Sequence, residues 1–369
     1  MTVGVLGGGQ LGRMLALAGA PLDEPIVFLD PNAESPGGHV GELIVGAYDD
    51  PKAIEALAAH CKVATYEFES VPVSAVRGLE EHGVEVFPPA GALEVAQDRF
   101  LEKSFFAKQG IPTAGFARID TREELAAAAA SLGLPAVLKT RRFGYDGKGQ
   151  VVLRDAFEVD AAWEAVRQAP SILEQFVRFE RELSILVVRG KSGEVATYPL
   201  VENHHAGGIL RVSYAPAPNV SAALQARAAE YAEKVARELA YVGVLAIEFF
   251  VGKGPKSEES LVANEMAPRV HNSGHWTIEG AETSQFENHL RAVLGLPLGG
   301  AACVGASAMV NLIGKTPSRE AVLAIPGAHL HLYGKEPAPG RKIGHVTVRG
   351  ASHADIKERV AQVRALAEA

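Results

Sequence analysis

The turn at the start of the chain limits its possible folds more than any other feature. An apolar run, Val3–Leu6, leads into glycines spaced as Gly7-x-Gly9-x-x-Gly12, and a helical pattern follows. This spacing predicts a tight turn from a strand into a helix, with room for a ligand beyond it. A second apolar run, Ile26–Asp30, ends in an acid where a dinucleotide fold holds a ribose hydroxyl. A nicotinamide-dependent dehydrogenase is therefore one candidate.

The alternation of strand and helix patterns continues beyond this turn. Val63–Glu67 and Val84–Phe87 read as strands, and Ala53–His60 and Val73–His82 read as helices. This rhythm predicts a parallel sheet covered by helices on both faces. Residues 96–175 then read as a small α+β unit, and the remaining chain follows a more antiparallel pattern.

Composition and charge narrow the class of protein. The 369 residues carry a net charge of −8, which argues against a nucleic-acid partner because phosphate backbones attract clustered Lys and Arg. The two cysteines, Cys61 and Cys303, lie far apart in the sequence, so we expect no disulfide framework. We find no signal-peptide pattern and no apolar run long enough to span a bilayer. These features predict a cytoplasmic protein of two or three domains that binds no membrane.

A glycine-rich turn separates two predicted strands. Lys139 ends the first strand, and the stretch GYDGKGQ that follows contains Gly144, Gly147 and Gly149, with Lys148 between the last two. Glycines let main-chain N–H groups approach a ligand, and the lysines add positive charge. No Gly-Lys-Ser/Thr opens a helix here, so this is not a Walker A loop. The stretch predicts either a flap that binds phosphate or a plain hairpin tip.

Two acids lie inside otherwise apolar strands. Glu248 stands in LAIEFF and Glu265 in ANEMAPR, and counting outward from the intervening loop places them nearly opposite each other. Opposed side chains on antiparallel strands lie close together, so two carboxylates there repel. Mg²⁺ relieves such repulsion, because it binds one or two carboxylates together with substrate phosphates. The pair predicts a magnesium site, and two solvated acids are the alternative.

A polar loop follows Glu265 at the end of its strand. It contains Arg269, His271, Asn272 and Ser273. Functional residues are commonly placed in such loops, and a plain loop does not need this mixture of side chains. The loop is therefore a candidate part of the same site.

A basic segment stands out in this acidic protein. The segment PGRKIGHVTVRG carries Arg341, Lys342, His345 and Arg349. It predicts either an anion site, for example for a phosphate monoester, or a solvated basic turn. Two acids, Glu67 and Glu69, end the strand beside the opening turn, at the edge where open α/β sheets bind ligands.

In combination these motifs resemble the ATP-grasp superfamily and, within it, the family of N5-carboxyaminoimidazole ribonucleotide synthases. The segments that carry the resemblance span nearly the whole chain in the family's order: GGGQLGRM, YEFE, GYDGKGQ, YPLVENHHAGGILR, NEMAPRVHNSGHWT and PGRKIGH. The resemblance implies an α/β and α+β fold of ATP-grasp architecture. It places a Rossmann-like preATP-grasp domain over 1–95, a lid domain with its linker helix over 96–175, and a C-terminal domain over 176–369.

The resemblance also implies a reaction. ATP would activate bicarbonate as carboxyphosphate, and the exocyclic amine of 5-aminoimidazole ribonucleotide would capture the carboxyl group, with release of ADP and phosphate. Mg²⁺ is the implied metal, small molecules are the implied partners, and a homodimer is the implied assembly. Position 148 is Lys where many family members carry Arg, which puts a bidentate anion contact there in doubt.

Site residues carried over from this resemblance fall into four groups. Those expected to bind ATP are Arg99, Lys139, Gly144, Tyr145, Asp146, Gly147, Lys148, Gly149, Gln150, Glu174, Gln175, Phe176, Val177, Glu182, His205, Asn264 and Glu265. The expected metal ligands are Glu248 and Glu265. Those expected around bicarbonate and the reacting amine are Tyr145, Lys148, Arg269 and His271. Those expected to bind the ribonucleotide are Gln10, Leu11, Glu67, Asn272, Ser273, Lys342 and Arg349, with the last two at its phosphate. His204 is the alternative to His205, which we favour from its register with GGILR.

Three alternatives stay open at this point. A dehydrogenase explains the opening turn and Asp30 but not the acid pair, the glycine-rich turn or the basic segment. A formate-dependent glycinamide ribonucleotide transformylase shares the lid and the acid pair, but in that family we expect Glu where Gln10 stands. A non-catalytic nucleotide-binding module does not need both acids and both loop lysines.

Overall fold

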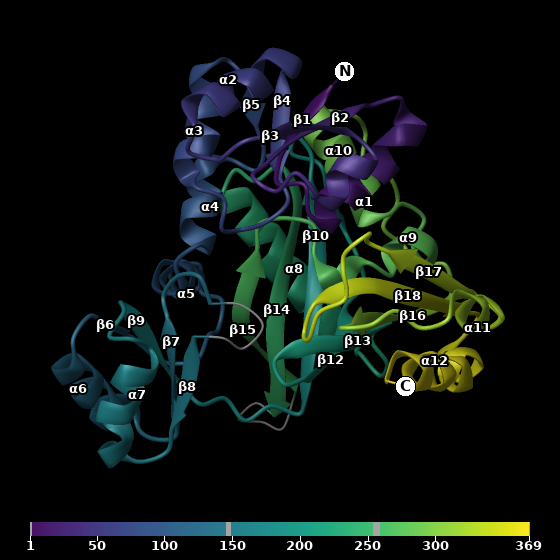
Figure 1. Ribbon diagram of the computed structural model, residues 1–369. Coiled ribbons are helices and arrows are strands. Elements are labelled where there is room, and N and C mark those ends of the chain that lie inside the picture. The colour runs from purple at the N-terminus through teal and green to yellow at the C-terminus, as the bar shows by residue number, and fades with distance from the viewer. Residues whose placement is uncertain (1, 145–148, 254–258, 369) are drawn as a thin grey trace.

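Three sheets organise the chain, as a computed structural model shows (Figure 1). The structure describes residues 2–144, 149–253 and 259–368, so the predictions for Tyr145, Asp146, Gly147 and Lys148 lie outside the described residues. The sheets fall within residues 3–86, 116–175 and 181–350. The division at residues 95 and 175 stays our proposed domain division. In the described ranges no helix is long and apolar enough to cross a membrane.

A parallel five-stranded sheet forms the N-terminal part, in the order β3-β2-β1-β4-β5. Its strands are β1 (Val3–Leu6), β2 (Ile26–Asp30), β3 (Glu42–Val45), β4 (Val63–Tyr66) and β5 (Glu85–Val86). Its helices are α1 (Gln10–Gly19), α2 (Pro51–His60) and α3 (Val73–Glu81), with 3₁₀ turns at Ala20–Leu22 and Pro36–His39. The predicted parallel sheet is confirmed. The edge strand β3 is absent from the predicted elements because it is short and only partly buried.

Successive strands are added on one side of β1 up to β3 and on its other side from β4 onward, so the strand order reverses between β1 and β4. Both strands run in the same direction, so the glycine turn after β1 and Glu67 after β4 meet at one edge of the sheet. Open parallel sheets bind ligands at such a position. The turn itself requires glycine, since Gly7 has a φ of 100° and a Cβ on Gly12 would lie 2.8 Å from the Gly7 carbonyl oxygen.

A four-stranded antiparallel sheet forms a separate lobe at the lower left of Figure 1. Its strands in spatial order are β6 (Phe116–Ile119), β9 (Ser171–Gln175), β7 (Ala136–Thr140) and β8 (Gln150–Leu153). The helices α6 (Arg122–Leu132) and α7 (Val159–Ala165), the latter preceded by a 3₁₀ turn at Ala156–Glu158, pack against it. Residues 90–108 form two helices, α4 (Ala90–Ala96) and α5 (Arg99–Lys108), with a break between them. The break occurs because the Asp98 carboxylate accepts from two N–H groups in the first turn of α5.

The rest of the chain is built on a nine-stranded antiparallel sheet. Its order is β15-β14-β10-β12-β13-β16-β18-β17, with β11 paired to β10. The strands are β10 (Arg181–Arg189), β11 (Val195–Thr197), β12 (Val201–Ala206), β13 (Ile209–Ala215), β14 (Gly243–Lys253), β15 (Glu259–Ala267), β16 (Ala306–Ile313), β17 (Ala328–Leu332) and β18 (Lys342–Gly350). The helices are α8 (Ala222–Glu238), α9 (Thr277–Gly280), α10 (Gln285–Leu294), α11 (Arg319–Leu323), α12 (His353–Glu368) and the 3₁₀ turn η4 (Asn272–Gly274). The antiparallel character predicted for this part is confirmed.

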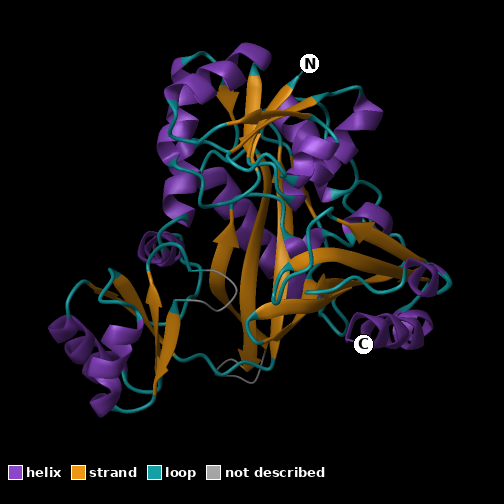
Figure 2. Ribbon diagram, in the orientation of Figure 1, coloured by secondary structure: helices purple, strands orange, loops and turns teal. Residues whose placement is uncertain are grey.

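Helix α10 joins the N-terminal sheet to the large sheet. Leu11 and Leu15 of α1 share a buried cluster with Phe286 and Leu290 of α10 and with residues of β14. The helices and strands of this part of the fold can be followed in Figure 2. This packing fixes the edge that carries the glycine turn above one end of the large sheet. Residues of the four-stranded sheet, such as Lys139 and Gln150, border the same space as residues of these two sheets.

Candidate active site

A cavity of about 710 Å³ lies where the three sheets meet. This volume suits a drug-sized or nucleotide ligand. The predicted site residues that line it come from all three sheets and the linker helix: Gln10, Leu11, Glu67, Arg99, Lys139, Gly144, Gln150, Glu182, His205, Glu248, Asn264, Glu265, Arg269, His271, Asn272 and Lys342. Among the described residues, the predicted Gly149, Glu174, Gln175, Phe176, Val177, Ser273 and Arg349 do not line it. Of the 31 described residues that line the cavity, 16 were therefore predicted as site residues, and the exceptions are informative.

The two acids occupy the floor of the cavity on adjacent strands. Glu248 of β14 is paired with Glu265 of β15, next to a β-bulge, so the predicted opposition is confirmed. Arg99 Nη1 donates to Glu265 Oε2 at 2.7 Å. Burial raises the pKa of Glu265, but the charge and hydrogen bond of Arg99 outweigh it and bring that pKa to about 2. Burial and then the charge of Glu265 raise the pKa of Glu248 to about 7.

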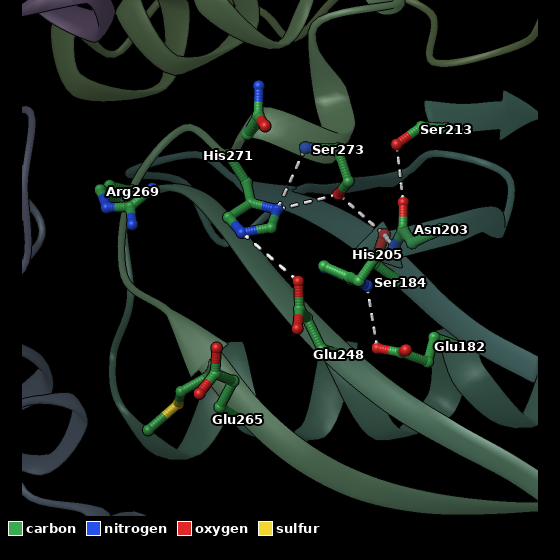
Figure 3. Close-up of polar contacts among 12 residues, drawn as sticks. Glu182, Ser184, Asn203, His205, Ser213, Glu248, Glu265, Arg269, His271 and Ser273 are labelled. Atoms are coloured by element: carbon green, nitrogen blue, oxygen red, sulfur yellow. Dashed lines mark hydrogen bonds and ion pairs between the residues drawn. The ribbon is translucent and has the colours of Figure 1, made fainter. Parts of the chain in front are cut away.

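His271 stands over Glu248 at the end of β15 (Figure 3). Its Nε2 lies 3.6 Å from Glu248 Oε1, and its Nδ1 lies 2.8 Å from Ser273 Oγ. Burial, and next the charge of Arg269, lower the pKa of His271 to about 3, so the ring is neutral at pH 7. Ser273 is fully buried and contacts His271 behind the cavity wall. Its predicted contact with the ribonucleotide is therefore corrected to a contact with His271.

Arg269 joins the end of β15 to the end of β4. Its Nε donates to Glu69 Oε2, and its Nη1 donates to the Val270 carbonyl oxygen at 3.1 Å. Burial raises the pKa of Glu69, but the charge of Arg269 outweighs burial and lowers it below its usual range. This ion pair connects the N-terminal sheet to the large sheet, and both of its residues line the cavity.

Two lysines, Lys139 of β7 and Lys103 of α5, meet at the Glu174 carboxylate, and of the two only Lys139 lines the cavity. Lys139 Nζ donates to Glu174 Oε2 at 3.0 Å, and Lys103 Nζ lies 3.5 Å from the same oxygen. The Glu174 side chain is therefore engaged by two lysines inside the fold and does not line the cavity. The main-chain N–H groups of Gln175 and Phe176 are also engaged, with the carbonyl oxygens of Gly115 and Pro135. The predicted main-chain contact of residues 174–177 with adenine would therefore have to use groups other than these two N–H groups.

The two candidate histidines of VENHH point to different surroundings. His205 lines the cavity, and its Nδ1 lies 3.0 Å from Glu182 Oε2. The side chain of His204 is 54% exposed and pairs with Glu202. A β-bulge between the two residues accounts for the difference. This geometry favours His205, as the register of the sequence predicts.

Asn264 is the bulged residue beside Glu265 on β15, and it lines the cavity. Its Oδ1 is buried and finds no hydrogen-bond partner within the described ranges. A buried acceptor of this kind needs a donor, since leaving it unpaired costs about 1–3 kcal/mol. The atom is therefore available to a ligand in the cavity.

Three family models match the chain in succession. They are the Ribonucleotide synthetase preATP-grasp domain over residues 1–97, the ATP-grasp domain over 104–286 and the Phosphoribosylaminoimidazole carboxylase C-terminal domain over 307–359. The N5-carboxyaminoimidazole ribonucleotide synthase of Pseudomonas aeruginosa is 52% identical over 369 residues, which is 100% of both chains. The chain belongs to the N5-carboxyaminoimidazole ribonucleotide synthase family.

Solved structures from the synthase family share the fold. The N5-carboxyaminoimidazole ribonucleotide synthetase of Thermus thermophilus matches with a TM-score of 0.93 and 55% identity, over 99% of this chain and 98% of that one. The N5-carboxyaminoimidazole synthase of Aspergillus clavatus, in complex with ADP and 5-aminoimidazole ribonucleotide, matches with a TM-score of 0.91 and 34% identity, over 100% and 98%. The predicted ATP-grasp fold and the predicted family are confirmed.

In this member of the synthase family, two carboxylates of the chain itself accept hydrogen bonds from the N–H groups of the opening turn. Glu67 accepts from the N–H groups of Gly9, Leu11 and Gly12 at 2.8, 3.0 and 2.9 Å. Asp30 accepts from the N–H of Gly8 at 2.7 Å. In a dehydrogenase these donors and Asp30 serve the cofactor. Here they are satisfied within the fold, so the nicotinamide alternative loses its structural basis.

The basic segment requires a correction. Lys342 and Arg349 stand at opposite ends of β18, about 20 Å apart at the rise of a strand with one bulged residue, and of the two only Lys342 lines the cavity. They cannot hold one phosphate together. The sequence analysis missed Lys335, whose Nζ donates to Gln10 Oε1. Burial lowers the pKa of Lys335, and the nearby charges of Arg341 and Lys342 lower it further against the effect of Glu67. A second lysine so near in sequence to Lys342 is the signal that could have found it.

Proposed function

We propose that the protein carboxylates 5-aminoimidazole ribonucleotide to N5-carboxyaminoimidazole ribonucleotide in purine biosynthesis, using ATP and bicarbonate and releasing ADP and phosphate. One observation carries this proposal. A single cavity brings together the glycine turn of the first sheet, the flanks of the glycine-rich hairpin and the opposed acids. The family membership supports the same reaction.

The ATP phosphates would lie between the lid and the acid pair. Arg99 and Lys139 line this part of the cavity and supply positive charge. Arg99 Nη2 also donates to the Gly144 carbonyl oxygen at 3.4 Å, which ties it to the start of the glycine-rich hairpin. Glu182, His205 and Asn264 line the cavity on the large sheet and would border the nucleotide there. Water exclusion by the hairpin would protect the acyl phosphate from hydrolysis.

The acid pair fits Mg²⁺ held jointly by protein and substrate. Within residues 2–144, 149–253 and 259–368 no group of three or more His, Cys, Asp or Glu side chains is placed to hold a metal ion. Two carboxylates together with substrate phosphate oxygens suit Mg²⁺. Glu248 and Glu265 would hold the ion, which when bound neutralises charge on the transferred phosphoryl group.

The ribonucleotide would bind against the first sheet. Gln10 and Leu11 begin α1 and line the cavity there, and Lys342 lines the facing wall. Lys335 and Arg341 lie close to Lys342, so this cluster is our proposed site for the substrate phosphate in place of Arg349. Glu67 would act by holding the turn that presents Gln10.

Arg269 and His271 also line the cavity and would lie between the two proposed binding regions. The guanidinium of Arg269 would stabilise the anionic carboxyl group, and neutral His271 would donate a hydrogen bond to it. The amine nitrogen forms a bond to the carboxyl carbon and loses a proton, while phosphate leaves as the anion. No covalent enzyme intermediate is needed, because positioning and charge stabilisation carry the step.

Release of ADP tests the proposed function. It should require ATP, Mg²⁺, bicarbonate and 5-aminoimidazole ribonucleotide together, with omission of any one reducing it to background. Release stimulated by formate plus glycinamide ribonucleotide, but not by aminoimidazole ribonucleotide, would overturn the proposal in favour of the transformylase. We also propose a cytoplasmic homodimer, as the family resemblance implies, and sedimentation velocity tests the assembly.

A further inference from the structure

A chain of buried hydrogen bonds runs across the large sheet to His271 (Figure 3). Its members are Ser213, Asn203, Ser184 and Ser273, and each is at most 5% exposed. Ser184, Asn203 and Ser213 do not line the cavity, and the proposed reaction gives them no part. Buried polar side chains are expensive unless they are paired, so this chain calls for an explanation.

The strand register places the members of the chain side by side. Asn203 of β12 is directly opposite Ser213 of β13. Ser184 of β10 is directly opposite Glu248 of β14, so it shares the face of the sheet that carries the acid pair. Ser273 of η4 lies over this face. The sheet therefore aligns four polar groups that are far apart in the sequence.

The hydrogen bonds of the chain all point in one direction. Ser213 Oγ donates to Asn203 Oδ1 at 2.7 Å, and Asn203 Nδ2 donates to Ser184 Oγ at 2.9 Å. These lengths match O–H···O and N–H···O bonds respectively, which supports this orientation of the amide. Ser184 Oγ then donates to Ser273 Oγ at 2.7 Å. The Ser273 hydroxyl hydrogen is left to donate to His271 Nδ1 at 2.8 Å.

A main-chain donor fixes the state of the histidine ring. The Ser273 N–H points to His271 Nδ1 at 3.3 Å, and a backbone N–H can only donate. Two donors therefore meet at Nδ1, which must be the acceptor nitrogen. In the neutral ring the hydrogen is then on Nε2, which faces Glu248 Oε1 at 3.6 Å.

We propose that Ser213, Asn203, Ser184 and Ser273 are positioning residues that hold His271 as its Nε2–H tautomer, with that N–H directed to the Glu248 side of the cavity. The inference rests on the proposed function only for what this N–H serves, the carboxyl group in transfer. The tautomer itself follows from the hydrogen bonds. Head-to-tail bonds in a low-dielectric interior strengthen one another, so a break far from the ring weakens its hold.

The tautomer is measurable without any activity. We would label the histidines with ¹⁵N, record the ring nitrogen spectrum at pH 7, and assign His271 by the signal lost in His271→Asn. The proposal expects a pyridine-type Nδ1 and a pyrrole-type Nε2. A pyrrole-type Nδ1 in the unaltered protein overturns it.

A pair of variants at Ser184 tests the effect on turnover. Ser184→Ala removes the central hydroxyl, and we expect kcat to fall about tenfold with KM for ATP unchanged. Ser184→Thr keeps the hydroxyl and should restore most of kcat. The matched control is Ser307→Ala, because Ser307 is equally buried in the same sheet and its Oγ has no partner in the described part of the chain. It should keep the full kcat.

The outcomes separate this inference from the proposed function. If Ser184→Ala and Ser184→Thr lower kcat equally, or if Ser184→Ala loses thermal stability but keeps kcat and the tautomer, the positioning role is wrong. If Ser184→Ala does not fold, the ¹⁵N spectrum of the unaltered protein and Ser213→Ala at the far end of the chain decide. A protein with the expected tautomer but no ADP release with aminoimidazole ribonucleotide contradicts the proposed function and leaves the tautomer established.

Discussion

The two opposed glutamates differ in charge state although they share one surface of the cavity. Arg99 contacts Glu265 and brings its pKa to about 2 against the effect of burial, whereas burial and the neighbouring charge raise the pKa of Glu248 to about 7. Arg99 therefore takes part of the role that the sequence analysis gave to a metal ion alone, since it already relieves the repulsion. Near neutral pH, Glu265 is the firmly ionised member of the pair.

Glu265→Gln tests the acid pair. The amide removes the negative charge but keeps an acceptor for Arg99, so the fold should persist while ADP release falls at least about 100-fold. The coupled ADP assay with all three substrates and Mg²⁺ measures this. Glu259→Gln, at the start of the same strand and 38% exposed, is the matched control and should keep the full rate. A Glu265→Gln enzyme at full rate means that the metal assignment is wrong.

Lys335 and Arg349 offer a direct comparison of the corrected and the original phosphate assignment. Lys335→Gln removes a charge beside Gln10, and we expect KM for aminoimidazole ribonucleotide to rise about tenfold, which corresponds to about 1.4 kcal/mol of binding. Arg349→Gln, at the far end of β18, should leave that KM unchanged. Steady-state kinetics at saturating ATP and bicarbonate measure both. The reverse pattern would restore the original assignment.

Helix α1 is the element most affected by one distant side chain. Its first turn has donors that no helical carbonyl can satisfy, and the Glu67 carboxylate accepts from three of them. The N-terminal end of a helix also favours negative charge. The turn predicted to bind a ligand is thus capped by the carboxylate of Glu67, the residue that follows β4.

Glu67→Gln should therefore destabilise the protein. The amide keeps one acceptor oxygen and no charge, and hydrogen bonds to a charged group contribute about 1.5–3 kcal/mol, so we expect a loss of about 2 kcal/mol. Urea unfolding measures it. Glu85→Gln, an exposed acid of the same sheet paired with Lys191, is the control and should change the free energy of unfolding by less than about 0.5 kcal/mol. An unchanged stability with a raised KM for the ribonucleotide would assign Glu67 to the substrate instead.

The sequence predicted elements and local register better than contacts between elements. Buried runs such as Val3–Leu6 have an apolar pattern that shows a strand directly, and counting from one loop was enough to oppose Glu248 and Glu265. Lys335 meets Gln10 across 325 positions, and no local pattern encodes such a contact. The polar chain from Ser213 to His271 was missed for the same reason, because small polar residues in strands look unremarkable until sheet order aligns them.

At the scale of the whole molecule, a buried histidine joins the first sheet to the large one. His289 Nε2 lies 2.8 Å from Thr65 Oγ1 of β4, and its Nδ1 accepts from the Val244 N–H of β14 at 3.1 Å. The neutral ring with hydrogen on Nε2 satisfies both partners. Protonation would place a second N–H against the Val244 donor, so this contact depends on a neutral histidine.

Acidification should therefore weaken the molecule through His289. Burial lowers its pKa from 6.5 to about 4, so between these values the unfolded chain binds more protons than the folded one, and stability is lost as pH falls. From pH 7 to pH 5 this contributes a loss of about 2 kcal/mol. His289→Gln keeps polar contacts but cannot titrate, so its free energy of unfolding should change by about 2 kcal/mol less over the same range. Urea unfolding of both proteins at the two pH values measures the difference, with the exposed His60→Gln as control. If the free energy of unfolding changes equally with pH in all three proteins, His289 does not cause the loss of stability on acidification.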